Sequence, residues 1–470
     1  MENKEVVKKA MTGVKFTFFA QLLVLVLSVI RAFVLPKILS VDDYGYWQVY
    51  VFYSAYVGLF ALGYNDGIYL KYGKYQYEEL PFERLRSSNI IYVLMLAIFT
   101  VLACLGSLFF DDSFRMWAMI GVSLDIFLMG INGLLVYVLQ ITNQMKAYSF
   151  YSVLDKVVLL VEIVLIMFLP TRTSVWVVFA DVISKATVTV SLLWRFRSFF
   201  LGKRLPMKDG VSDFTDNVKI GLNLMIANLM GMFVTGIGRF IVDTFGSIEE
   251  YAYYSFGITV TNLVLVFITA VSLVLYPTLK RLPEANYKGY FEKLNFFVTA
   301  FNFIALFAYF PAVWFIKLYL PDYISILAYL HFLFGVIVLQ AKMQLLNNTF
   351  YKVLREEKAL MRSNLVCVFI FLVLALISYY FAKNVAVIAV STFVAMLYRC
   401  YVSEVFIRKK MGLKVPFGMF VEIFYVVIFT LAIQFTNSWI ALAIYFVIFV
   451  IWCAFSISKI KELILFIKKR

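Results

Sequence analysis

The sequence contains few of the residues from which metal and catalytic sites are usually built. His331 is the only histidine, and the four cysteines are scattered through apolar stretches without C-x-x-C spacing. This pattern argues against a histidine metal cluster, a zinc framework and a disulfide scaffold. No G-x-x-x-x-G-K-[ST] loop is present, so we expect no ATP hydrolysis by this chain. No metal or cofactor is predicted.

Charged residues and long polar segments are also scarce. Charged residues make up 15% of the 470 residues, and no large polar domain separates the apolar stretches. A membrane polymerase or acyltransferase usually carries a substantial polar loop. The sequence therefore predicts a protein that is not an enzyme.

Hydrophobic residues dominate instead. They make up 63% of the chain, against roughly half in soluble globular domains. Because a helix needs about 20 mainly apolar residues to cross a bilayer, the sequence predicts an all-α integral membrane protein of about fourteen transmembrane helices. The apolar stretches are 15–39, 44–70, 88–110, 117–141, 149–169, 174–196, 218–245, 252–279, 291–316, 323–348, 361–382, 385–407, 416–436 and 438–458.

The basic residues concentrate on one side of this arrangement. The net charge is +15, and most of the 43 basic residues fall in alternate connections, while the opposite connections contain only Lys37, Arg115, Arg172, Lys317 and Lys383. Cytoplasmic loops are enriched in lysine and arginine, so we expect both termini to be cytoplasmic. This distribution accounts for the positive charge without a nucleic-acid partner, and the predicted surroundings are the lipid bilayer.

Two segments of similar sequence occur at equivalent places in the chain. One lies at residues 40–47, with the sequence SVDDYGYW, and the other at residues 247–254, with the sequence SIEEYAYY. We therefore expect two pseudo-symmetric six-helix bundles around a central cavity. The predicted divisions are an N-terminal bundle at 1–196, a cytoplasmic linker at 197–217, a C-terminal bundle at 218–410, and two additional helices with a basic tail at 411–470.

These segments carry a resemblance to a known family. The stretch from Leu39 to Gly45 resembles the Leu-Gly-x-x-x-Tyr-Gly signature of Wzx-type oligosaccharide flippases, with Ser40 where the family usually has glycine. Residues 62–67, with the sequence LGYNDG, are similar to that family's break near the end of its second helix, and residues 239–241 to its helix-seven segment. The resemblance extends to the larger MATE/MurJ-related (MOP) superfamily.

The resemblance implies a function, a location and partners. A protein of this kind would move undecaprenyl-pyrophosphate-linked oligosaccharide repeat units from the cytoplasmic to the outer leaflet by alternating access, for surface polysaccharide biosynthesis. It would lie in the bacterial inner (cytoplasmic) membrane, with a polysaccharide polymerase and glycosyltransferases as expected partners. A MATE-type cation or drug antiporter and a lipid II flippase are the alternatives with the same fold.

Basic residues inside predicted helices are candidate binding residues, because ionisable groups are costly in a bilayer unless they face a cavity or a partner. We predict that Arg31 and Arg239, in the first helix of each repeat, bind the anionic pyrophosphate through paired hydrogen bonds. The alternative is that each snorkels to the nearby membrane surface. Lys185 is a further candidate for the anion, although its spacing from Asp181 equally predicts an ion pair within one helix.

Acidic residues inside the predicted helices are candidates for gating or ion coupling. A buried carboxylate can carry a coupling proton, and structural pairing with a neighbouring helix is the alternative. One of these acids lies between Gly63 and Gly67, a spacing that indicates either a helix break or close helix packing. The candidates are Asp66, Asp125, Asp155, Glu162 and Asp181.

Other polar and aromatic residues have simpler interpretations. Lys342 and Arg399 lie in the inner thirds of their predicted helices, so we expect both to snorkel to the cytoplasmic surface. Aromatic residues, at 19% of the chain, are expected mainly in belts at the two membrane surfaces. His331 is expected to pack within the bundle.

Overall fold

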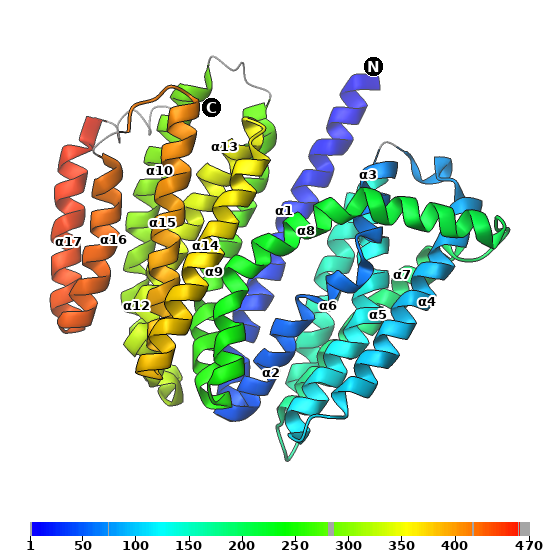
Figure 1. The fold of residues 1–470 in the computed structure, drawn as a ribbon, viewed down its shortest axis with the longest axis horizontal. Helices are drawn as coiled ribbons and strands as arrows, with labels where there is room; N and C mark the ends of the chain where they lie inside the picture. The colour runs from blue at the N-terminus through cyan, green and yellow to red at the C-terminus, as the bar shows by residue number, and fades with distance from the viewer. Residues whose placement is uncertain (1, 74, 281–285, 416–417, 459, 461–470) are drawn as a thin grey trace. The chain divides into compact units, whose positions relative to one another are not determined.

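The chain folds almost entirely into helices. The computed structural model describes residues 2–73, 75–280, 286–415, 418–458 and 460, and it contains no strand within those ranges. The chain forms two compact units, Met1–Met232 and Phe233–Arg470. Figure 1 traces both units from the N-terminus to the C-terminus.

The first unit is built around α5. This helix packs against α2, η1, α3, α4 and α7, while α1 packs mainly against α6. The unit contains α1 (Glu2–Ile38), α2 (Val41–Ser54), η1 (Val57–Ala61), α3 (Tyr64–Tyr72), η2 (Tyr77–Glu79), α4 (Phe82–Ser107), α5 (Ser113–Ile141), α6 (Met145–Ile166), α7 (Ser174–Arg195), η3 (Arg197–Phe199) and the first part of α8 (Met207–Phe245).

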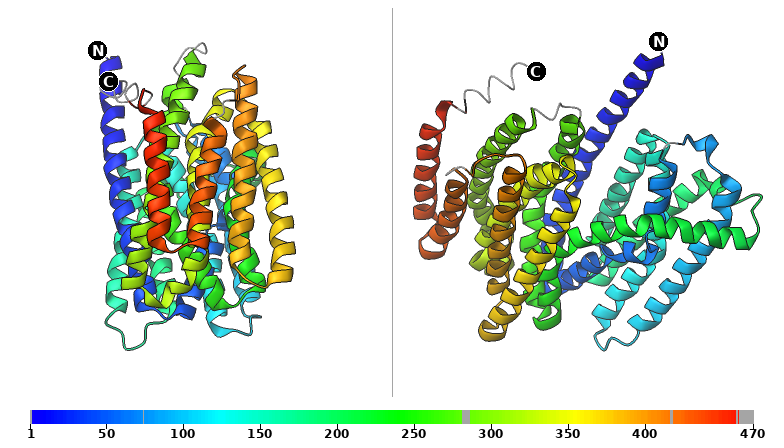
Figure 2. Two further views of the ribbon diagram at one scale, coloured as in Figure 1. Left: turned by 90° about the vertical axis from the view of Figure 1, so that its left-hand side faces the viewer. Right: turned by 45° about the horizontal axis from the view of Figure 1, so that its top comes forward.

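The second unit is built around α12, which packs against α9, α10, α15 and α16. Figure 2 shows the helices of this unit running alongside one another. Since α5 and α12 each cover the fourth apolar stretch of a predicted repeat, the two units share the same central element. The unit contains the end of α8, then α9 (Ile248–Lys280), α10 (Tyr287–Phe307), α11 (Tyr309–Tyr319), η5 (Pro321–Ile326), α12 (Leu327–Lys342), η6 (Met343–Asn347, a π-helical turn), α13 (Asn348–Val353), α14 (Glu357–Ala382), α15 (Ala386–Lys410), α16 (Gly418–Phe435) and α17 (Ser438–Phe455).

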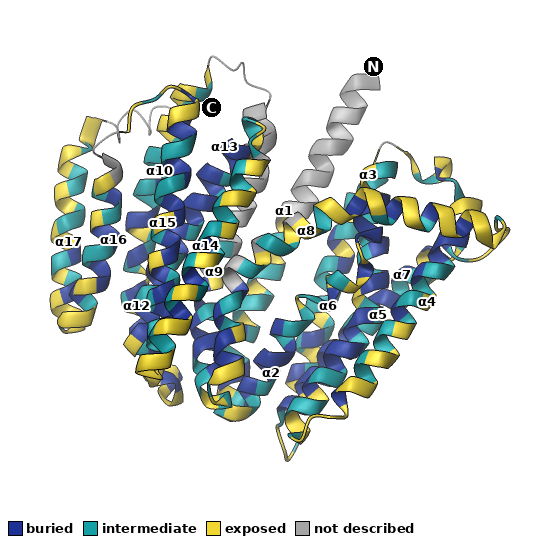
Figure 3. Cartoon of the chain, viewed as in Figure 1, coloured by how far each residue is buried: buried dark blue, intermediate teal, exposed yellow. Residues whose placement is uncertain are grey.

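Exposed positions lie along the outside of the helices in both units (Figure 3), and many of them hold large apolar side chains. Ile98 and Val101 of α4 are each 58% exposed, and Phe369 of α14 is 67% exposed. Within the described residues, nine helical segments are long and apolar enough to cross a membrane. These surfaces suit lipid rather than water, so the protein is a multi-pass membrane protein. The number of fourteen crossings stays a prediction.

Several of the most exposed aromatic side chains lie at helix ends. Phe109 follows α4, Phe168 follows α6, and Trp439 lies in the first turn of α17. Aromatic rings at such positions sit at the level of the lipid headgroups. The interfacial belts stay a prediction.

The two similar sequence segments both start helices. At the start of α2, the Ser40 hydroxyl accepts the backbone N–H of Asp43 at 3.1 Å. At the start of α9, the Ser247 hydroxyl accepts the N–H of Glu250 at 3.1 Å, and the Glu250 carboxylate accepts the N–H of Ser247 at 3.0 Å. Each serine is therefore a helix N-cap, and at α9 the reciprocal contact completes a capping box. The repeated motif specifies where a helix begins in each unit.

The first half of α8 runs across α3 (Figure 1). We predicted a linker over 197–217, but α8 already begins at Met207, and the boundary between the units falls at Met232 within this helix. The crossing is so close that a Cβ on Gly67 would lie 1.9 Å from the Asn217 carbonyl oxygen, and a Cβ on Gly221 would lie 2.0 Å from the Gly63 carbonyl oxygen. Gly67 thus serves helix packing, while Gly63, with φ +79° between η1 and α3, serves both the helix break and the packing.

Candidate functional site

A shallow hollow in the first unit brings together cationic side chains from two helices. It lies between α1 and α6. Lys156 forms an ion pair with its neighbour Asp155, whereas Arg31 has no hydrogen-bond or ion-pair partner within the described part of the chain. An unpaired guanidinium bordered by aliphatic side chains suits an anion that is attached to a hydrocarbon chain. The lining residues are Leu27, Ser28, Arg31, Lys156, Leu159, Leu160 and Ile163.

Lys185 lies at the centre of a buried charge cluster. Its Nζ is 2.5 Å from Asp125 Oδ2 on α5 and 2.7 Å from Asp181 Oδ2 on α7, and it donates to the Tyr50 hydroxyl on α2 at 2.9 Å. The predicted Asp181–Lys185 ion pair is confirmed. Because each of the three ammonium hydrogens has an acceptor, none remains for a phosphate. In this structure Lys185 is therefore the counter-ion of Asp125 and Asp181, and it is not placed to bind an anion.

Hydroxyl groups on α2 complete this Lys185 cluster. Tyr50 donates to Asp181 Oδ2 at 2.6 Å, and Ser54 donates to Asp125 Oδ2 at 2.6 Å. Asp125 is fully buried, and its Oδ1 has no hydrogen-bond partner in the described structure. Two carboxylates facing one ammonium leave an excess of negative charge in the interior. These contacts join α2, α5 and α7 at one point.

The hollow and the Lys185 cluster are linked electrostatically through Asp181. The positive charges of Lys156 on α6 and Arg31 on α1 act on Asp181 in addition to that of Lys185. An anion that binds at the hollow would compete with Asp181 for these two charges.

Asp155 and Glu162 are seven residues apart and lie on one side of α6, where Asp155 contacts α7. The Ser184 hydroxyl donates to Asp155 Oδ1 at 2.9 Å, and Lys156 pairs with the same carboxylate. Glu162 Oε2 is buried without a hydrogen-bond partner among the described residues, and the negative charges of Asp181 and Asp155 act on Glu162. Lys156 therefore neutralises Asp155, whereas Glu162 has no cation partner among the described residues.

Asp66 lies apart from these groups, on α3. Its side chain is 8% exposed, and the Tyr137 hydroxyl donates to its Oδ1 at 3.4 Å. The more strongly paired acid of this region is Asp213 of α8, which is fully buried and contacts Lys71 at 2.9 Å and Arg84 at 2.7 Å. We did not predict this site, because Asp213 falls in the segment that the sequence analysis assigned to a linker.

The second unit contains its own buried charge network, which corrects two expectations. Lys342 is 2% exposed and pairs with Glu404 Oε2 at 2.6 Å and with Glu422 Oε2. Arg399 is also buried and donates to the Asn364 side chain at 2.6 Å. Neither side chain snorkels to the membrane surface, because each has polar partners on neighbouring helices.

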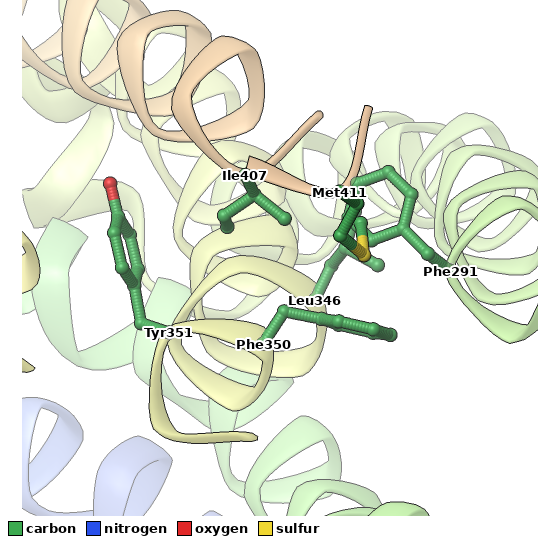
Figure 4. Packing of buried hydrophobic residues seen from close by; sticks show 6 residues of the cluster. All are labelled: Phe291, Leu346, Phe350, Tyr351, Ile407 and Met411. Atoms are coloured by element: carbon green, nitrogen blue, oxygen red, sulfur yellow. The ribbon is translucent and has the colours of Figure 1, made fainter. Parts of the chain in front are cut away.

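This network continues from Glu404 toward the end of α15. Arg408 is fully buried and donates to Glu404 at 2.7 Å and to Glu292 of α10 at 2.6 Å. Its guanidinium also lies 5.1 Å from the ring centre of Phe291, which belongs to the apolar cluster in Figure 4. Glu404 was not predicted as a site residue, although its i,i+4 spacing from Arg408 was an available signal.

Arg239 lies in the second unit, on α8. Its Nη2 donates to the Ser255 carbonyl oxygen of α9 at 3.3 Å, and its Nε is buried without a partner in the described structure. Part of its hydrogen-bonding capacity is therefore open, as it is for Arg31 in the first unit.

Comparison with known proteins decides the family. The model of a family described as polysaccharide biosynthesis protein matches residues 10–282, which is more than half of the chain. The chain belongs to this polysaccharide biosynthesis protein family. Among individually curated proteins, none matches the sequence.

Solved structures show the fold of this polysaccharide biosynthesis protein. A structure of the lipid II flippase MurJ in an inward closed conformation is similar over 96% of this chain and 100% of its own, with a TM-score of 0.65 and 13% identity. A structure of the MATE multidrug transporter DinF-BH covers 87% and 97%, with a TM-score of 0.56 and 13% identity. A mutant of the Vibrio cholerae MATE transporter VcmN covers 87% and 98%, with a TM-score of 0.54 and 12% identity. At these identities the likeness establishes a shared fold, and the predicted all-α membrane fold class is confirmed, while the count of fourteen helices stays a prediction.

Proposed function

We propose that this membrane protein is a flippase that moves undecaprenyl-pyrophosphate-linked oligosaccharide repeat units from the cytoplasmic to the outer leaflet of the bacterial inner membrane. It acts by alternating access and serves surface polysaccharide biosynthesis. The observation that supports this proposal is the hollow in which Arg31, which has no ion-pair partner among the described residues, and the partly exposed Lys156 lie among leucine side chains. Membership of the polysaccharide biosynthesis protein family supports it independently.

The chemistry of the hollow fits the shared part of such substrates. A pyrophosphate carries several negative oxygens, which the Arg31 guanidinium can meet with two parallel hydrogen bonds and Lys156 with a third. Leu159 and Leu160 would contact the first units of the polyprenyl chain. We propose Arg239 of the second unit as a further phosphate-binding guanidinium, because its Nε is buried without a partner in the described structure.

The sign of the available charge distinguishes this proposal from a cation antiporter. None of the described residues that line the hollow is a carboxylate, and Asp155, the acid next to it, pairs with Lys156. The unpaired group that borders the hollow is a cation. Under this proposal, Asp66, Asp125, Asp155, Glu162 and Asp181 serve gating or ion coupling, and the polymerase and glycosyltransferases of the same pathway act nearby.

The proposal predicts that Arg31→Ala and Lys156→Ala slow translocation. Each change removes a charge-assisted hydrogen bond to phosphate worth about 1.5–3 kcal/mol, which corresponds to a loss of roughly 10- to 100-fold. The measurement is the appearance of a fluorescent polyprenyl-pyrophosphate-linked oligosaccharide in the outer leaflet of vesicles that contain the purified protein.

Arg172→Ala is the matched control, because Arg172 is an exposed cation in the turn that follows α6. It should translocate at the wild-type rate. Wild-type rates in both hollow variants would overturn the proposal. Parallel vesicles with lipid II test the alternative flippase, and faster movement of lipid II than of the oligosaccharide lipid would favour it.

A further inference from the structure

The outward side of the first half of α8 carries apolar, basic and acidic side chains in a fixed order around the helix. This part of α8 runs across α3, and its inward face holds the small and polar residues Gly210, Asp213, Asn217 and Gly221. The exposed positions lie on the opposite side (Figure 3). Because successive residues of an α-helix are about 100° apart, these exposed positions fall into three bands that run along the helix.

The apolar band borders the buried face. It consists of Met207, Val211 and Leu222, each at least 37% exposed. These three positions lie within about 60° of one another around the helix. Large apolar side chains at such exposure are stable beside hydrocarbon and costly beside water.

The basic band comes next and consists of Lys208 and Lys219. Both lysines are exposed, and neither has an ion-pair partner among the described residues. Their positions differ by only about 20° around the helix, so both ammonium groups extend from the same side. A lysine side chain can lay its methylene groups along an apolar band and hold its charge at the band's edge.

The acidic band lies on the far side of the lysines from the apolar band. It consists of Asp209 and Asp216, both exposed. The buried Asp213 follows next around the helix, and it already receives positive charge from Lys71 and Arg84. Cations of α3 and α4 are therefore placed on the acidic side of α8, whereas the two lysines of the basic band are left without a counter-ion.

We propose that the first half of α8 lies in the cytoplasmic surface of the bilayer and binds phosphate groups of anionic phospholipids through Lys208 and Lys219. The order of the bands matches the layers of such a surface, with acyl chains at the apolar band, phosphates at the lysines and water at the acids. An acidic protein partner would pair with the lysines, but it would not require the bands to follow the depth of a membrane. No residue of the hollow takes part, so this lipid site is independent of the proposed function.

Fluorescence quenching in vesicles tests the proposal. In a full-length variant without its four native cysteines, Val211→Cys is labelled with the fluorophore NBD and reconstituted into lipid vesicles. The vesicles contain either phosphatidylglycerol or phosphatidylcholine with a nitroxide quencher in its acyl chain. Competition between the two lipids gives the binding constant of the anionic lipid relative to the zwitterionic one.

Phosphatidylglycerol should be favoured by about fivefold for each lysine, which is the usual contribution of one basic side chain near an anionic membrane surface. In the double variant Lys208→Gln with Lys219→Gln, the relative binding constant should fall to near one. High salt should weaken the preference of the unsubstituted lysines, because counter-ions screen exposed charges.

Two controls match this experiment. The double variant Arg172→Gln with Lys383→Gln removes the same number of exposed cations from other connections and should keep the full preference. An NBD label on Asp216→Cys should be quenched less than the label on Val211→Cys, because the acidic band faces water. Thermal unfolding of each variant confirms that it is folded.

Three results would overturn the proposal. Equal quenching by the two lipids would show that the lysines do not select anionic headgroups, and so would a preference that persists without Lys208 and Lys219. Absence of quenching at Val211→Cys by either lipid would show that this side of α8 does not touch the bilayer, and it would favour a protein partner instead.

Discussion

Lys342 and Lys410 form ion pairs in very different surroundings. The Lys342 side chain is 3% exposed and bridges two carboxylates, whereas Lys410 is 53% exposed and contacts Glu356 near the end of α15. Removing one partner of a buried ion pair leaves an uncompensated charge, while an exposed pair contributes little. The two lysines therefore offer a matched comparison at the scale of a residue.

We predict that Lys342→Met lowers the free energy of unfolding by about 3–5 kcal/mol, because Glu404 and Glu422 both lose the cation that they share. Lys410→Met should change it by less than about 1 kcal/mol. Thermal unfolding of the purified variants in detergent measures both effects. Equal shifts in the two variants would show that the Lys342 network does not stabilise the unit.

At this scale the sequence predicted the contacts that lie within one helix. The Asp181–Lys185 ion pair was predicted from its i,i+4 spacing. Arg31 was predicted as a candidate binding residue because it is a charged residue in the first apolar stretch. The partners of Lys342 could not be predicted, because Glu422 lies 80 residues away on a different helix. The same holds for Lys156, since only the packing of α1 on α6 shows that it shares a hollow with Arg31.

At the scale of an element, the crossing of α3 and α8 depends on the absence of side chains. Gly67→Ala should destabilise the first unit by about 1–3 kcal/mol, because its Cβ would meet backbone atoms of α8 that cannot rotate away. Thermal unfolding measures the effect. Gly106→Ala in α4 is the control, since nothing lies near its Cβ, and alanine favours a helix over glycine. A control variant less stable than Gly67→Ala would contradict this account.

The first turns of α8 show why a polar helix was missed. Its buried positions are Gly210, Asp213, Asn217 and Gly221, so the polar and small residues face inward. A search for apolar periodicity cannot detect such a helix. The spacing of three and four residues is helical all the same, and a search for polar periodicity would have located it. The long apolar helices were easier to predict because each matches the thickness of a bilayer.

At the scale of the whole molecule, the distribution of lysine and arginine predicts which connections face the cytoplasm. In a variant without its four native cysteines, Asp111→Cys should react with a membrane-impermeant maleimide in intact cells. Lys203→Cys should react only after the membrane is permeabilised, because it lies in a basic connection. Both positions are exposed, so access to the reagent depends on the side of the membrane alone. The reverse labelling pattern would invert the predicted topology.

The fold class and the family followed from composition and from one short motif, and the helices that cover each apolar stretch agree with that prediction. The charge networks in the two units did not follow, because they depend on contacts between distant helices. Prediction from sequence therefore succeeded where the bilayer or the local chain sets the constraint. It failed where tertiary packing sets it.

The paired serine caps at Ser40 and Ser247 have an evolutionary consequence. A gene duplication leaves two copies of every residue, and selection preserves those that both descendants still need. Starting a helix after a tight turn is such a shared need, whereas the charges inside each half have diverged. The common origin of the two halves is therefore clearest in the residues that start helices. Related proteins can change their substrate and still keep this helix-start motif.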